Sequence, residues 1–182
     1  RYFMHVTERR MLEAVDFARD HWLEAVLADH TTRWHSFLID DEQPVVERIW
    51  TQMDDEFLVA IHRILPVPAG SAPLFHWHRW PAGFFLLDGS YRTGIGHGPP
   101  GDLPPEVTRI LECHAGDRRV MIDPNEWHWV SPLRHSVISI MVFGRPYPGV
   151  PERVAKRPTL ALPRPRIENL LWTTRQLYGM AA

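Results

Sequence analysis

Residues 75–90 read Phe75-His76-Trp77-His78-Arg79-Trp80-Pro81-Ala82-Gly83-Phe84-Phe85-Leu86-Leu87-Asp88-Gly89-Ser90. Successive side chains of a β-strand point to opposite faces, so a strand through His76 and His78 would direct both imidazoles to the same side. Two imidazoles on one face form a chelating pair. The apolar run 84–87 predicts a second, buried strand, and Asp88-Gly89 predicts a tight turn that reverses the chain.

A third histidine follows downstream. His128 lies in the segment 122–132, which reads as a turn followed by a short strand rich in aromatic and β-branched residues. Between the two histidine segments come a proline-rich loop at 98–105 and a turn at Gly116-Asp117. This order of a His-x-His strand, a strand, a glycine turn, hairpins and a final histidine resembles the two sequence motifs of the cupin superfamily over residues 57–147.

The resemblance implies a mainly β fold: a cupin-like β-barrel, or double-stranded β-helix, with His76, His78 and His128 pointing into it as metal ligands. The usual first motif also carries a glutamate four or five residues beyond its second histidine. Here those positions hold Ala82 and Gly83, so the implied ligand set is three neutral imidazoles. Within the superfamily this pattern looks most like the thiol dioxygenases of the cysteine type.

The resemblance is weaker beyond the ligands. Thiol dioxygenases carry a strand reading roughly Ser-Leu-His-x-Tyr after the third histidine, and this chain has Ser139-Ile140-Met141-Val142-Phe143 instead. Met141 and Phe143 replace a polar pair that contacts substrate and oxygen, so we expect cysteine to be a poor substrate. An arginine before the first motif holds the substrate carboxylate in those enzymes, and both Arg48 and Arg63 are candidates here.

Length and composition predict one domain spanning residues 1–182. The 20 basic and 22 acidic residues nearly balance, which argues against a nucleic-acid partner. No apolar run reaches the roughly 20 residues of a membrane helix, and the first residues lack a signal-peptide pattern. The single cysteine, Cys113, cannot form an internal disulfide and is expected to be a core or loop residue, so the expected compartment is the cytoplasm.

The remaining elements follow from hydrophobic periodicity. Met11, Val15, Ala18, Trp22 and Val26 recur at helical spacing, which predicts an amphipathic helix over 7–29 with Thr7 as N-cap. Strands are expected at 34–39, 45–50, 57–67, 91–96, 119–122 and 137–143, and either a strand or a helical turn at 107–112. The barrel core should span 57–147, and a C-terminal extension at 148–182 should end in a helix over 167–178.

Alternation also assigns faces to the side chains around the histidines. Phe85, Leu87, Met141 and Phe143 are candidates for the inward face. The cupin resemblance implies that Gly83→Glu would restore a carboxylate at the position from which the common motif coordinates the metal. The tryptophans beside the ligands are expected to serve packing; they are Trp77, Trp80, Trp127 and Trp129.

Candidate catalytic residues come from the strand ends near the mouth of the expected barrel. They are Tyr91, Arg92 and His135, and His97 and Arg134 lie in similar positions. Three protein ligands would leave metal positions open for substrate, whereas a structural site is normally closed by a fourth ligand. Imidazole suits Fe(II), Zn, Ni and Cu alike, so the residue types leave the metal open. The alternative is that the three histidines are hydrogen-bonded core residues.

The first functional hypothesis is a mononuclear non-haem Fe(II) oxygenase that acts on a small organic substrate with dioxygen. A dipositive iron centre favours an anionic donor, such as a thiolate or carboxylate. The alternatives are a Zn- or Ni-dependent isomerase or lyase, and a cupin that binds a small molecule without chemistry. Cupins commonly dimerise, so the resemblance also allows a homodimer.

Overall fold

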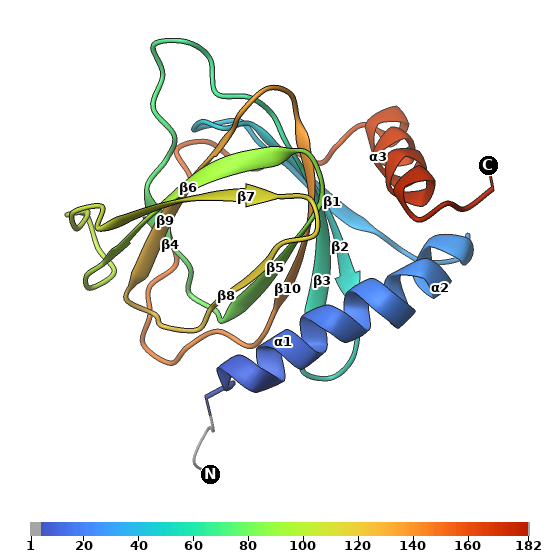
Figure 1. The fold of residues 1–182 in the computed structure, drawn as a ribbon, viewed down its shortest axis with the longest axis horizontal. Coiled ribbons are helices and arrows are strands. Elements are labelled where there is room, and N and C mark those ends of the chain that lie inside the picture. Colours follow the sequence, from blue (N-terminus) through green and yellow to red (C-terminus); the bar gives the residue numbers. More distant parts are fainter. Residues whose placement is uncertain (1–4, 182) are drawn as a thin grey trace.

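The computed structural model describes residues 5–181, and in this part of the chain ten strands form two antiparallel sheets that enclose a barrel (Figure 1). The larger sheet has the order β1 (His35–Ile39), β2 (Val46–Gln52), β3 (Leu58–Ile64), β10 (Val137–Phe143), β5 (Ala82–Asp88) and β8 (Arg118–Met121). The smaller sheet has the order β4 (His76–Trp77), β9 (Glu126–Pro132), β6 (Ser90–His97) and β7 (Arg109–His114). The late strands β9 and β10 insert between earlier ones, and this architecture confirms the predicted mainly β, cupin-like barrel.

Helical segments flank the barrel at both ends of the chain. The first comprises α1 (Glu8–Phe17), a π-helical turn η1 (Ala18–Trp22) and α2 (Leu23–Ala28), and α3 (Arg164–Leu177) follows the last strand. Thr7 caps α1 as predicted, because its hydroxyl accepts a hydrogen bond from the Arg10 amide at 3.1 Å. No helix among the described residues is long and apolar enough to span a membrane.

The π-helical turn shifts the buried stripe of the first helical segment. A π turn adds one residue to the repeat, so the stripe passes from Ala18 to Leu23 and Leu27, all fully buried. The predicted stripe continued through Trp22 and Val26, and these two side chains are only partly buried. Regular periodicity could not anticipate this change of phase.

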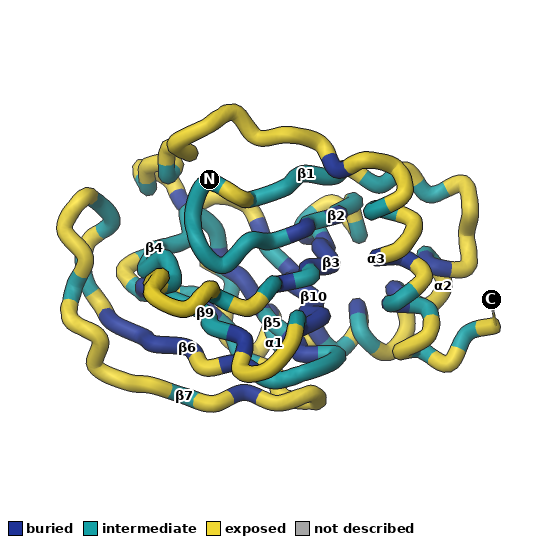
Figure 2. The backbone as a smooth tube through the Cα atoms, turned by 90° about the horizontal axis from the view of Figure 1, so that it is seen from above, coloured by how far each residue is buried: buried dark blue, intermediate teal, exposed yellow. Residues whose placement is uncertain are grey.

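The larger sheet is covered on both faces, and most positions along β3 and β10 are buried (Figure 2). Its outer face packs against the helices through residues such as Ile49, Ile61 and Ile140, which form one cluster with Met11 and Val15. Its inner face contributes to two apolar clusters in the barrel interior. One is built on Ala60, Ala82 and Met141, and the other joins Ile64, Leu86 and Val137 to Tyr91 and Cys113 of the smaller sheet.

The faces predicted for β5 are wrong by one residue. Phe85 and Leu87 belong to the outer cluster against the helices, whereas Phe84 faces the interior. A continuous apolar run carries no polar positions that mark its faces, because both faces of this sheet are covered. The prediction for β10 is confirmed at Met141, which lines the interior cavity. Phe143 packs against the same inner cluster.

The same register corrects the expectation for Gly83. A Cβ atom at Gly83 would lie 2.3 Å from Cγ2 of Val15 and 3.1 Å from Cγ of Met11, so this position faces α1 and not the histidines. Ala82 is the neighbour whose side chain faces the interior. A carboxylate at position 83 therefore cannot reach the site that the cupin glutamate occupies.

We expect Gly83→Glu to destabilise the protein by at least about 3 kcal/mol, because it forces a charged side chain into the apolar contact between β5 and α1. Gly101→Glu is the matched control, since a Cβ atom there meets nothing within 4 Å. Chemical denaturation of both variants measures the difference. Equal stability of the two variants would contradict the assigned register.

Candidate metal centre

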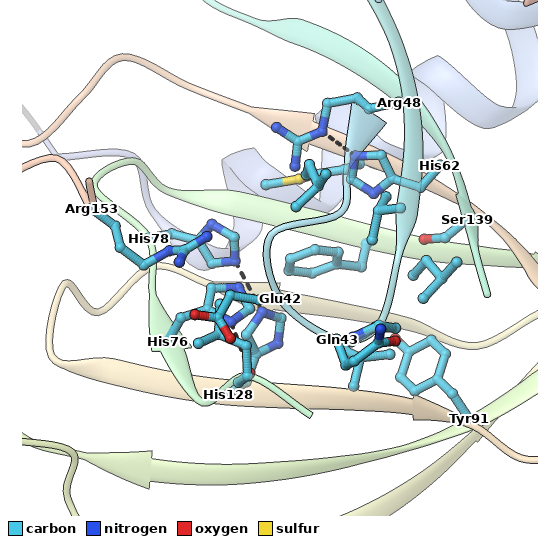
Figure 3. A pocket seen from close by; sticks show the side chains of 18 of the residues that line it. Glu42, Gln43, Arg48, His62, His76, His78, Tyr91, His128, Ser139 and Arg153 are labelled. Carbon is cyan, nitrogen blue, oxygen red and sulfur yellow. Dashed lines mark hydrogen bonds between the residues drawn. The ribbon is translucent and has the colours of Figure 1, made fainter. Parts of the chain in front are cut away.

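Three histidines meet where the smaller sheet closes the barrel (Figure 3). His76 of β4 pairs in register with His128 of β9, so both side chains point to the same inner face. β4 ends at Trp77, and His78 follows it outside the ladder. The predicted strand through both histidines is therefore shorter than expected, yet their imidazoles still converge. One ligand atom from each histidine lies within 4.8 Å of the others, and no other acidic or thiol residue of the described chain belongs to the group.

Within this group, the Nε2 atoms of His78 and His128 lie 2.9 Å apart. Two nitrogens that each lie 2.0–2.1 Å from one cation, at right angles, are about 2.9 Å apart. The pair therefore fits a shared metal ion.

A backbone contact fixes the orientation of the third ring. Nδ1 of His76 lies 3.1 Å from the carbonyl oxygen of Leu74. A carbonyl oxygen only accepts hydrogen bonds, so Nδ1 carries the proton and Nε2 keeps its lone pair. Metal-binding histidines are commonly oriented in this way by a carbonyl on the other ring nitrogen.

Burial keeps all three imidazoles neutral. His128 is 4% exposed, and His76 and His78 are partly buried. Desolvation lowers the pKa of His76 to about 4 and holds the pKa values of His78 and His128 well below the ordinary value. Neutral imidazole is the form that binds a metal, so the three rings could hold an ion at neutral pH.

The depressed pKa of His76 predicts a pH-dependent stability for the metal-free protein. Between pH 6.5 and about 4 the unfolded chain binds a proton at His76 that the folded chain does not, so stability is full above pH 6.5 and falls as the pH is lowered. We expect this residue to contribute at most about 3 kcal/mol of that loss. The measurement is the free energy of unfolding of wild type minus that of His76→Gln across this range. His135→Gln, at an exposed position, should match wild type, and a pH-independent difference for His76→Gln would contradict the prediction.

A cavity of about 110 Å³ opens from the histidines into the barrel interior. Its wall is mostly apolar and comes from both sheets, with Phe84 and Met141 on the larger sheet and Val130 on the smaller one. The Phe84 ring centroid lies 5.6 Å from that of His128. The cavity adjoins an outer cleft of about 480 Å³, and the two share Ile39, Arg48, His76, His78 and Arg153 as lining residues.

The structure brings one of the three predicted catalytic residues to the histidines. Tyr91 is 7% exposed and lines the cavity, and burial raises the pKa of its hydroxyl. Arg92, one residue further along β6, points outward to an exposed ion pair with Glu112. His135 is exposed in the turn before β10, and neither Arg92 nor His135 lines the cavity. His97 and Arg134 are exposed as well.

The choice between Arg48 and Arg63 follows from alternation on neighbouring strands. Arg63 points outward, where it donates to Glu47 at 3.0 Å and to Asn169 of α3 at 2.8 Å. Arg48 of β2 points inward and lines the cavity. Burial lowers the pKa of Arg48 to about 10, so it still carries its charge at neutral pH.

Sequence reasoning missed five polar residues of the cavity wall: Glu42, Gln43, His62, Arg119 and Arg153. His62 is 6% exposed, and its Nε2 accepts a hydrogen bond of 2.6 Å from Nε of Arg48. The alternation of β3 could have indicated His62, since it follows the inward-facing Ala60 by two positions. Glu42 and Arg153 lie on connecting segments, where periodicity carries no information.

The tryptophans beside the histidines differ in their burial, and Trp77 also lines the outer cleft. Trp127 is 2% exposed, and its ring centroid lies 4.8 Å from that of Trp77. Its Nε1 donates a hydrogen bond to the carbonyl oxygen of Gly98. Trp129 covers the face of Gly94, where a Cβ atom would lie 2.1 Å from its Nε1. Trp77 and Trp129 are only partly buried, so Trp127 is the fully buried member of the group.

No protein-family model matches the chain, and no curated protein sequence matches it. Among solved structures, the chain is similar to a KdgF protein from Halomonas sp. at 13% identity, covering 62% of this chain and 87% of that one with a TM-score of 0.44. An RmlC-like cupin from Shewanella frigidimarina shows 15% identity, coverage of 67% and 95%, and a TM-score of 0.45. An ectoine synthase from P. lautus shows 14% identity, coverage of 60% and 70%, and a TM-score of 0.44. The chemistry of this site therefore has to be argued from its own residues.

Proposed function

We propose that this chain is a mononuclear metal-dependent enzyme, and specifically a non-haem iron oxygenase that acts on a small anionic organic substrate. The observation that carries the proposal is the meeting of three neutral imidazoles with one inward-facing guanidinium at a largely apolar cavity. His76, His78 and His128 would hold the metal, and the absence of a carboxylate from this group keeps the positive charge of the ion undiminished.

Iron is preferred because the site is open. Three protein ligands leave positions for exogenous molecules, and an apolar wall suits dioxygen. When bound, Fe(II) would supply Lewis acidity and electrons for the reduction of dioxygen. The protein contributes the orientation of the substrate and a cavity that excludes water.

Arg48 is the residue that would orient the substrate. Its Nε donates to His62, which leaves both terminal nitrogens of the guanidinium for an anionic group. A guanidinium binds a carboxylate through two parallel hydrogen bonds. Phe84 and Met141 would contact the apolar part of the substrate, and the neighbouring Tyr91 could donate a hydrogen bond because its raised pKa keeps the hydroxyl protonated.

A second candidate is a Zn- or Ni-dependent isomerase or lyase. The observation that favours it is the carboxylate of Glu42 on the cavity wall, since such reactions need a group that accepts a proton near a metal-activated substrate. This reaction class consumes no oxygen.

Oxygen uptake by protein loaded anaerobically with Fe(II) separates the two candidates. We expect oxygen uptake with small carboxylates, either with or without a thiol group. We expect little uptake with free cysteine, because apolar Met141 and Phe143 stand where the cysteine enzymes have a polar pair. Turnover without oxygen uptake in Zn- or Ni-loaded protein would support the second candidate. Efficient oxygen uptake with cysteine would contradict the proposed substrate preference.

A further inference from the structure

We propose that the substrate carries two separate anionic groups, one bound by Arg48 of β2 and the other by Arg153 of the C-terminal segment. This inference rests on the proposed function, because it specifies the substrate class of the same site. It assigns a binding role to Arg153, which lies 105 residues from Arg48 in the chain.

The cavity wall carries more positive than negative charge. Four wall residues carry a formal charge at neutral pH: Glu42, Arg48, Arg119 and Arg153. Glu42 forms an ion pair with Lys156, and Arg119 forms a largely buried ion pair with Glu126. Among residues 5–181, no ion pair involves Arg48 or Arg153. The wall therefore has two positive charges without a counter-ion.

The guanidinium of Arg48 has few hydrogen-bond partners within the described protein. A guanidinium has five N–H donors, and the described protein groups satisfy only one of them, through His62. His62 is itself held neutral, because burial and the adjacent Arg48 depress its pKa. A cation withdrawn from water and partnered by a neutral ring is costly unless an anion compensates it. His62 therefore orients the guanidinium of Arg48 without neutralising its positive charge, which stays available for an anionic ligand.

Contacts of its own segment hold Arg153 in position. It is partly buried and lines both the inner cavity and the outer cleft, and Figure 3 shows its guanidinium beside the histidine group. Contacts on both sides anchor its segment. Before it, Glu152 pairs with Arg79 at 3.0 Å. After it, the Lys156 amide donates to Asp41 at 2.8 Å, and Arg157 donates to the carbonyl oxygen of Asp40 at 2.6 Å. A segment fixed in this way holds Arg153 at the junction of the two spaces.

The two guanidiniums come from different elements, and they face one small space beside three neutral imidazoles. Like charges repel, and a bound metal would add to the positive potential. A monoanion would compensate only one arginine, whereas a ligand with two anionic groups compensates both. The inner cavity of about 110 Å³ limits such a ligand to a short carbon chain, with its second group reaching toward the outer cleft.

The test compares succinate with butyrate, two four-carbon probes that differ by one carboxylate. Isothermal titration calorimetry on the purified full chain, with its metal content measured on the same sample, should show succinate binding at least about tenfold more tightly than butyrate. Arg153→Gln should remove this preference and leave butyrate affinity unchanged. Arg48→Gln should weaken both probes. Arg134→Gln is the control for loss of one exposed positive charge and should leave both affinities unchanged.

Several results would overturn the inference. They are equal affinity for the two probes, retention of the preference in Arg153→Gln, and the absence of binding by malonate, succinate and glutarate alike. Methylphosphonate, which carries its charge on one group, should bind more weakly than succinate, and equal or tighter binding would contradict two separate groups. The thermal midpoint of each variant reports whether it is folded. Because the arginines do not need the metal to attract an anion, a succinate preference in chelator-treated protein would survive failure of the metal assignment.

Discussion

Replacing His128 with alanine should reduce bound metal to well below one ion per chain and lower turnover by at least about 100-fold. The two remaining imidazoles, His76 and His78, are too few ligands to compete with water for Fe(II), and the group contains no carboxylate that could take the vacant position. The same result is expected for His76→Ala and His78→Ala. Metal analysis by mass spectrometry and a turnover assay measure the two effects.

Two matched variants control for the loss of a histidine as such. His135→Ala removes an exposed imidazole outside the cavity, and it should retain both metal and activity. His62→Ala removes a cavity imidazole that binds Arg48 instead of the ligand group, so metal should be retained while substrate affinity falls. Full metal occupancy in any one of the three ligand variants would exclude that histidine from the ligand set.

Arg48→Met should weaken substrate binding roughly 100-fold, since truncating one partner of a desolvated charge pair costs about 2–5 kcal/mol. The same change should leave the ligand-free protein as stable as wild type or more stable, because it removes a partly buried charge that lacks a counter-ion. The measurements are KM or probe affinity, together with the free energy of unfolding.

Arg63→Met is the control for this variant, because the two arginines lie on adjacent strands and differ in the face they occupy. Arg63 pairs with Glu47, which is 5% exposed, so its loss should destabilise the protein and leave substrate affinity unchanged. A loss of affinity in Arg63→Met, or unchanged affinity in Arg48→Met, would reverse the assignment of the two residues.

The sequence predicts the architecture well because the strongest signals are local. The turn at Gly89 has a φ of +85°, a value that favours glycine, and the strand over 137–143 has the predicted bounds. The order of strands and histidines, read with the cupin resemblance, gives the barrel and the meeting of His76, His78 and His128.

The incorrect predictions of which side chains face the cavity have a common physical origin. Strand β5 is covered on both faces, so its apolar run predicts a strand without saying which residues face inward. Phe84 therefore replaces Phe85 at the cavity, and Gly83 faces α1. Arg92 lies next to Tyr91 in sequence and points outward for the same reason of alternation. If one residue of a strand faces the cavity, the next residue therefore faces away from it.

Other features depend on contacts between distant parts of the chain. The pairing of Arg48 with His62 follows from the register of β2 with β3, in which these residues lie opposite each other. Arg153 reaches the cavity because its segment is tied to the loop after β1, through Asp40 and Asp41. Neither contact leaves a pattern in the sequence around the residue itself.

We propose that His76, His78 and His128 together bind one metal ion. The most direct test is the metal stoichiometry of the wild-type protein, purified without chelators and reconstituted anaerobically with Fe(II) before removal of unbound ions. We expect about one tightly bound ion per chain, displaced when the pH is lowered and the imidazoles are protonated. A stoichiometry near zero after reconstitution with Fe(II), Zn, Ni and Cu in turn would contradict it, and the three histidines would then be core residues that hydrogen-bond to one another.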